Sequence, residues 1–134
     1  MIWRLAKSLL KLREQVNELY PHRDKASDGS IGDLAHSQRK SDHNPNAHGV
    51  VTAIDIDKDL RANDPFAMSH LVLELQNSGD KRIKYIIWNG QITLPNDITR
   101  WKKYTGINQH KHHCHISVSA NPDLYDNDSA WSIA

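Results

Sequence analysis

The chain has 134 residues, of which 38% are hydrophobic and 25% charged, and its net charge is +1. This length is sufficient for a hydrophobic core and predicts a single domain over residues 1–134. The near-neutral balance argues against recruitment to nucleic acid or to a membrane surface by bulk charge. The single cysteine, Cys114, excludes an internal disulfide and a four-cysteine zinc site.

The N-terminal segment predicts an amphipathic helix that starts at the beginning of the chain and ends near Pro21. Its apolar residues recur at spacings of three and four: Ile2, Leu5, Leu9, Leu12, Val16 and Leu19. Charged residues interrupt the apolar part, and no cleavage-like ending follows, so we expect no signal peptide. No run approaches transmembrane length. We therefore expect cytoplasmic synthesis, a separate route to any substrate outside the membrane, and a monomer.

Residues 22–49 form a long polar connection rich in turn-forming residues. A connection of this length is uncommon in a compact domain unless it carries function. Residues 34–40 are compatible with a short helix. Arg39 lies four residues before His43 and is either a cation that faces the substrate or a solvated side chain.

Residues 50–56 have the composition of a strand, in which alternate side chains point to opposite faces. Ile54 and Ile56 then face the core together with Val50 and Thr52, whereas Asp55 points to the other face with Val51 and Ala53. A carboxylate on such a strand is costly to bury unless it is paired or binds a metal ion. This cost makes Asp55 a candidate metal ligand, with an exposed strand-end Asp as the alternative.

The middle of the chain predicts a second helix and a hairpin. Asp64-Pro65 is typical of a helix start and Asn77-Ser78-Gly79 of a helix end. Asn89-Gly90 between two β-rich runs predicts a β-hairpin over residues 83–94. Residues 100–103 are expected to form a basic loop in which aromatic side chains either line a groove or cover a core edge. The core face of the second helix comprises Met68, Leu71, Val72 and Leu75, and the aromatic residues of the loop region are Trp101 and Tyr104.

Four imidazoles lie between residues 110 and 115, and the last two begin a β-type run. Alternation places His113, His115 and Ser117 on one face, and Cys114 with Ile116 on the other. Cys114 is therefore expected in the core as a small apolar residue and not as a nucleophile. The segments 41–57 and 110–118 together could supply two His nitrogens and one Asp oxygen. Three such ligands with one open position describe a catalytic zinc site.

These motifs resemble the zinc peptidase superfamily of lysostaphin, D-Ala-D-Ala peptidases and hedgehog. Ser41-Asp42-His43 matches its opening Ser-x-His, residues 53–56 (Ala-Ile-Asp-Ile) match its Asp motif, and residues 113–118 match its final His-x-His element. The run Ser-Asp-His-Asn-Pro at 41–45 is also similar to a group of small phage and bacterial proteins assigned to this superfamily. The resemblance covers residues 36–118. It implies an α+β fold, with a small antiparallel sheet flanked by two main helices.

The resemblance implies zinc held by His43, Asp55 and His115, with His113 assisting catalysis and Arg39 holding a substrate carboxylate. His43 precedes Asp55 by twelve residues, where the common peptidases have seven. We interpret the extra residues as a loop insertion, and His48 is the alternative first ligand. His112 stands where D-Ala-D-Ala peptidases carry an acidic base, so His112 and His110 stay open beside His113 as the base.

The function implied is cleavage of peptide bonds in bacterial peptidoglycan, as in a phage endolysin or a D,D- or L,D-type peptidase. The substrate would be a cell-wall stem peptide, with no nucleic-acid or membrane partner. Three alternatives remain at this point. They are a metal-dependent nuclease, for which the chain carries little positive charge, a zinc-binding interaction module without catalysis, and a histidine cluster that binds no metal.

Overall fold

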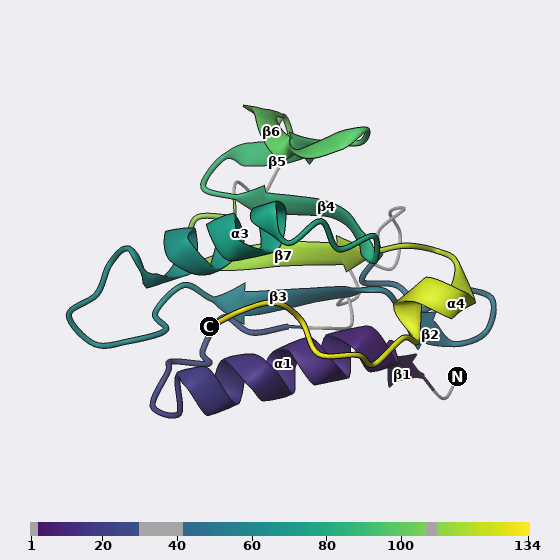
Figure 1. Ribbon diagram of the computed structural model, residues 1–134, viewed down its shortest axis with the longest axis horizontal. Coiled ribbons are helices and arrows are strands. Elements are labelled where there is room, and N and C mark those ends of the chain that lie inside the picture. The colour runs from purple at the N-terminus through teal and green to yellow at the C-terminus, as the bar shows by residue number, and fades with distance from the viewer. Residues whose placement is uncertain (1–2, 30–41, 107–109) are drawn as a thin grey trace.

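The computed structural model describes residues 3–29, 42–106 and 110–134, which form an α+β structure around a five-stranded antiparallel sheet (Figure 1). The strand order is β3-β7-β4-β5-β6. Two further short strands, β1 and β2, pair in parallel. The strands are β1 (Arg4–Leu5), β2 (Val50–Val51), β3 (Ala53–Asp57), β4 (Ile83–Trp88), β5 (Gln91–Leu94), β6 (Asp97–Lys103) and β7 (His113–Val118), and the helices are α1 (Lys7–Leu19), α3 (Ala67–Asn77) and α4 (Pro122–Tyr125).

Alternation along β3 and β7 separates a core face from a polar face. Ile54 and Ile56 of β3 pack with Cys114, Ile116 and Val118 of β7 in one hydrophobic cluster. The helices complete this cluster with the apolar stripes that their 3.6-residue periodicity predicts. In Figure 1, α3 lies across the sheet near β4 and β7, and α1 runs along β3. The helical residues of the cluster include Leu9, Leu12 and Val16 of α1 and Met68, Leu71, Val72 and Leu75 of α3.

The predicted class, α+β with a small antiparallel sheet, is confirmed. The hairpin is confirmed as β4 and β5, joined at Asn89 and Gly90, whose φ angles are 52° and 81°. Two consecutive positive φ angles are those of the tight turn that Asn-Gly favours. The finer likeness to the peptidase fold is a prediction that this topology does not test.

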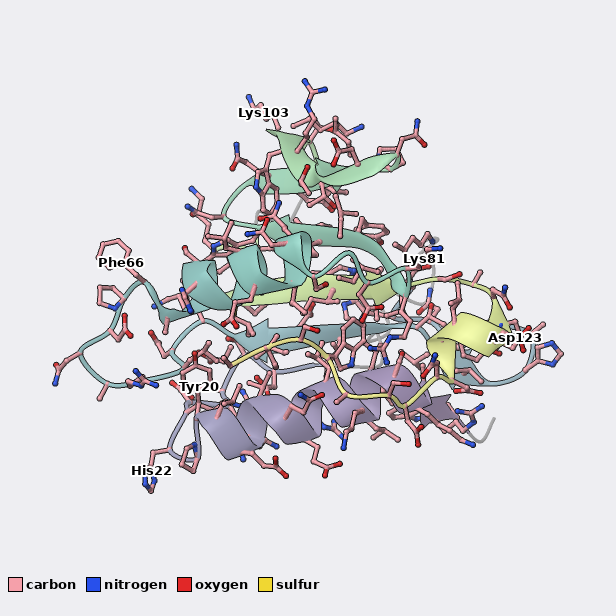
Figure 2. The ribbon with its side chains drawn as sticks, viewed as in Figure 1. Tyr20, His22, Phe66, Lys81, Lys103 and Asp123 are labelled. Atoms are coloured by element: carbon pink, nitrogen blue, oxygen red, sulfur yellow. The ribbon has the colours of Figure 1, made fainter. Side chains whose placement is uncertain are left out.

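Four predicted boundaries were wrong. Helix α1 begins at Lys7 and not at the start of the chain, because Arg4–Leu5 pair with β2 instead. Residues 50–56 form two strands, since Thr52 separates β2 from β3. Helix α3 begins at Ala67, two residues after Pro65, and the preceding Phe66 is 75% exposed and projects outward (Figure 2). Residues 100–103 belong to strand β6 and not to a loop.

The C-terminal tail is fixed to the body of the protein by Trp131. Its ring is buried, and its Nε1–H donates to the carbonyl of Ser8 at 2.8 Å. The short helix expected over residues 34–40 lies outside the described residues, as do Arg39 and Ser41. Within the described part of the chain, no helix combines the length and apolar character that spanning a bilayer would require.

Candidate metal centre

The centre of the site is the cross-strand pair of Asp55 and His115. Strands β3 and β7 run antiparallel with Asp55 directly opposite His115, and Asp57 opposite His113. Since Ile54, Ile56, Cys114 and Ile116 face the core, Asp55 and His115 point to the polar face of the sheet. Two neighbouring strands therefore place a carboxylate beside an imidazole without any loop rearrangement.

His43 reaches the same point from the loop before β2. The amide of Thr52 donates to the Asp42 carbonyl at 3.3 Å, and the Asp42 carboxylate pairs with Lys84 Nζ of β4 at 3.0 Å. The Asn46 side chain accepts from the amides of His48 and Val50, which closes a turn over residues 46–50. This turn lies between His43 and Asp55 in the chain and returns it to strand β2.

His43, Asp55 and His115, hereafter the metal cluster, bring three ligand atoms together. His43 Nε2 lies 3.0 Å from His115 Nδ1 and 3.2 Å from Asp55 Oδ1, and His115 Nδ1 lies 3.1 Å from the same oxygen. Ligand atoms at about 2.0–2.2 Å from one tetrahedral zinc ion lie roughly 3.3 Å apart. The metal cluster could therefore hold a metal ion with small adjustments.

The second ring nitrogen of His115 is fixed by Ser117. Nε2 lies 2.8 Å from Ser117 Oγ, and the Tyr85 ring stacks on the imidazole at 5.4 Å between centroids. When Nε2–H donates to the hydroxyl, Nδ1 presents its lone pair to the metal cluster, as in many metal sites where an outer hydrogen bond fixes the tautomer. Burial lowers the pKa of His115, although the hydrogen bond with Asp55 opposes this shift.

Asp55 is held as a carboxylate. Burial alone would raise its pKa, but hydrogen bonds with His115 and His43 outweigh burial and leave the pKa well below its ordinary value. The backbone of Asp55 is paired on its outer side with Gly29, through bonds of 2.7 and 3.1 Å. Gly29 thus pairs with the strand edge that carries the carboxylate.

A third histidine lies beside the other carboxylate oxygen, and a fourth packs against it. His113 Nε2 is 3.4 Å from Asp55 Oδ2, and His110 packs edge-on against His113 with ring centroids 4.9 Å apart. Ligand atoms of Asp55, His110 and His113 all lie within 4.8 Å of one another. Asp55 therefore has His43 and His115 at Oδ1 and His113 at Oδ2, with His110 packed against His113.

The other sequence candidates lie elsewhere. His48 and His112 are both exposed and belong to neither group, and Arg39 lies outside the described residues. Cys114 is fully buried in the core, and burial raises the pKa of its thiol, so it is unsuited to be a nucleophile. The expectation that Cys114 is a core residue is confirmed.

The third candidate metal group consists of Asp24, Asp57 and Asp59. The carboxylates of Asp24 and Asp57 accept hydrogen bonds from nearby backbone amides. The Asp57 carboxylate accepts from the amide and hydroxyl of Ser27 at 3.0 and 2.7 Å, and from the amide of Asp59 at 2.9 Å. Nearby, Arg23 and Asp28 form a salt bridge of 2.7 Å. These contacts give the acidic residues a structural role.

A groove of about 480 Å³ adjoins the metal cluster at Tyr85, whose ring forms part of its wall. Its lining combines apolar residues with three lysines, of which Lys81 is seen in Figure 2 near the end of the sheet that faces α4. Burial raises the pKa of the Tyr85 phenol to about 12, so the ring is neutral at ordinary pH. The lining includes Lys81, Ile83, Lys84, Tyr85, Ile92 and Lys102.

Sequence reasoning missed Tyr85 and the contact between Ser117 and His115. The alternation of β7 already placed Ser117 on the face of His115, so the pattern contained a signal for that contact. Tyr85 gave no such signal, because the register of β4 shifts between Ile83 and Tyr85 and breaks the alternation. His110 was predicted only as an alternative base.

Comparisons with protein-family models, with curated proteins and with solved structures found no match.

Proposed function

We propose that this protein is a zinc-dependent peptidase that cleaves peptide bonds in the stem peptides of bacterial peptidoglycan. The proposal combines the resemblance of the motifs at residues 41–45, 53–56 and 113–118 with the geometry of the site. Zinc is the proposed ion because two imidazoles and one carboxylate, with a fourth position open, are the donors of catalytic zinc sites.

The observation that carries the proposal is the convergence of His43 Nε2, His115 Nδ1 and Asp55 Oδ1 to within 3.2 Å of one another. Three such groups are costly to remove from water, and their lone pairs repel one another at these distances, unless they share a proton or a cation. A bound zinc ion would supply Lewis-acid chemistry, polarising a carbonyl and acidifying water.

His113 is the residue that we propose moves the proton. Its Nε2 lies 3.4 Å from Asp55 Oδ2, and its side chain is 13% exposed, so it lies beside the metal cluster and at the edge of solvent. Imidazole exchanges protons near neutral pH, which suits a general base in hydrolysis. Asp55 would hold the metal beside this ring.

The groove beside Tyr85 is the proposed binding surface for the peptide. Its lining includes Lys81, Lys102 and Lys84, the last paired with Asp42, together with apolar residues, a combination suited to peptides that carry carboxylates next to small apolar side chains. Arg39, implied by the resemblance to hold a substrate carboxylate, would add to this preference.

The test is mass spectrometry of purified peptidoglycan fragments after incubation with the protein, with and without a chelator. We expect new fragments only when zinc is present, and their masses identify the bond that is cleaved. Asp55→Asn should abolish their release, whereas His48→Asn, an exposed histidine of the adjacent loop, should release them at the wild-type rate. Release by Asp55→Asn at the wild-type rate, or no release by the zinc-loaded protein, would refute the proposal.

A further inference from the structure

We infer that Asp55, His110 and His113 form a second binding site for a divalent transition-metal cation, with Asp55 bridging the two sites. The second site shares Asp55 with the metal cluster of the proposed function, but its existence does not depend on peptidase activity. Two imidazoles and a carboxylate are donors suited to zinc and its neighbours rather than to magnesium or calcium.

The first observation is the division of the two carboxylate oxygens of Asp55. Oδ1 is 3.1 Å from His115 Nδ1 and 3.2 Å from His43 Nε2, whereas Oδ2 is 3.4 Å from His113 Nε2. A carboxylate with nitrogen donors at both oxygens can bridge two cations, which in two-metal sites lie about 3.5–4 Å apart.

The second observation is the state of His113 Nε2. This atom is buried and makes no hydrogen bond, although Asp55 Oδ2 lies 3.4 Å away. A buried polar atom without a hydrogen bond calls for a specific explanation, and an ion is one of the few available. A cation between Nε2 and Oδ2 would satisfy both atoms.

The third observation is the placement of His110. Its side chain is only 7% exposed and packs edge-on against the rings of Tyr104, His113 and His115. Its backbone has a φ of 55°, which is uncommon for a residue with a side chain, and its carbonyl accepts from the amide of Asn89 at 3.0 Å. Unusual backbone geometry that directs an imidazole inward is typical of functional sites.

The second site should bind more weakly than the first. The two cations would repel each other across a single shared carboxylate, so the ion that binds second is held less tightly. A cation there would occupy the lone pair of His113 that the proposed reaction uses, so excess metal would oppose proton transfer.

The test is equilibrium dialysis of the full chain against zinc chloride, followed by elemental analysis after a wash with a weak chelator. The wild-type protein should bind two ions, the second at least about tenfold more weakly, and His110→Asn should bind one. Asn is the replacement because it tolerates the positive φ at this position. The matched control, His112→Asn, removes an exposed imidazole two residues away and should still bind two.

A second measurement keeps the inference testable if His110→Asn does not fold. In the wild-type protein, the ¹⁵N resonance of His113 Nε2 should shift when the second equivalent of zinc is added. The inference would be overturned if the wild-type protein bound only one ion, or if a folded His110→Asn variant bound two. It would also be overturned if the His113 resonance did not shift with the second equivalent of zinc. A protein that binds two ions but releases no peptidoglycan fragments would support this site and count against the proposed function.

Discussion

Ser117 determines which nitrogen of His115 faces the metal cluster. Its hydroxyl lies 2.8 Å from Nε2, on the side of the ring away from Asp55 and His43. A metal ligand of this kind depends on its outer partner for both ring orientation and tautomer. Because residues two apart in a strand share a face, Ser117 lies beside His115 and can fix the tautomer of its ring.

We expect Ser117→Ala to weaken zinc binding by about 10- to 100-fold, because His115 loses the partner that fixes its tautomer. Competition with a chromogenic chelator measures the affinity. The control is Ser132→Ala, at an exposed position in the tail, which should bind zinc as the wild type does. Equal affinities for Ser117→Ala and wild type would mean that this contact does not orient the ligand.

At the scale of elements, Arg82 ties the tail to the start of β4. Its guanidinium donates to the carbonyls of Asn127 and Ser129 at 2.7 and 2.8 Å, pairs with Asp80 at 2.6 Å, and lies 3.8 Å from the centre of the Trp131 ring. The side chain is 5% exposed, so these contacts are made away from water. Arg82 therefore joins four separate groups through one cation.

Replacing Arg82 with Met should lower the free energy of unfolding by about 3 kcal/mol, because the carbonyls and Asp80 lose their partner in a buried setting. Urea denaturation measures this change. Lys81→Met, at the exposed neighbouring position, should stay within about 0.5 kcal/mol of wild type. A loss for Arg82→Met as small as that of the control would contradict the role assigned to Arg82.

The ion pair between Asp80 and Arg82 also predicts how the stability of the protein depends on pH. Burial acts to raise the pKa of Asp80, but the hydrogen bonds from Arg82 outweigh burial and leave the pKa below its ordinary value. A folded-state pKa below the unfolded one stabilises the protein above the unfolded pKa, about 3.9, and this contribution is lost as the pH falls through the folded value. The gap in unfolding free energy between wild type and Asp80→Asn should therefore narrow from pH 6 to pH 3, as measured by urea denaturation. A difference in unfolding free energy that stayed constant with pH would show that ionisation of Asp80 does not stabilise the fold.

Sequence periodicity predicted the elements that have one buried face and missed those that do not. The core stripe of α3 and the Asn-Gly hairpin were recognisable because burial and turn geometry each impose a pattern. Strand β6 carries none, since its side chains are exposed or only partly buried along its whole length and three of its last four residues are basic. The pairing of Arg4–Leu5 with β2 depends on a partner 46 residues away, which local periodicity does not encode.

At the scale of the whole molecule, the site depends on three segments that meet on one face of the sheet. The alternation of side chains in β3 and β7 could be predicted residue by residue, and it correctly placed Asp55 and His115 on the polar face of the sheet. The approach of His43 could not be derived this way, because it depends on the turn at Asn46 and on the ion pair between Asp42 and Lys84. The resemblance to a known motif, rather than physical pattern, selected His43.

The groove gives a prediction about substrate preference. Lys102→Glu should raise the KM for a stem peptide that carries carboxylates by about two- to fivefold, the effect expected of an exposed charge, with little change in kcat. Steady-state kinetics on matched acidic and amidated peptides measures the difference. Lys11→Glu on α1, remote from the groove, should leave both constants unchanged. Equal effects of Lys102→Glu on the acidic and amidated peptides would exclude a charge-based preference at the groove.

The central claim is that one metal ion is held jointly by His43, Asp55 and His115. Anomalous X-ray diffraction at the zinc edge, from crystals of the protein prepared with one equivalent of zinc, tests it most directly. We expect a single strong peak at about 2.0–2.2 Å from His43 Nε2, Asp55 Oδ1 and His115 Nδ1. A peak at the exposed His48 or His112 instead, or no peak between the three side chains of the metal cluster, would contradict it.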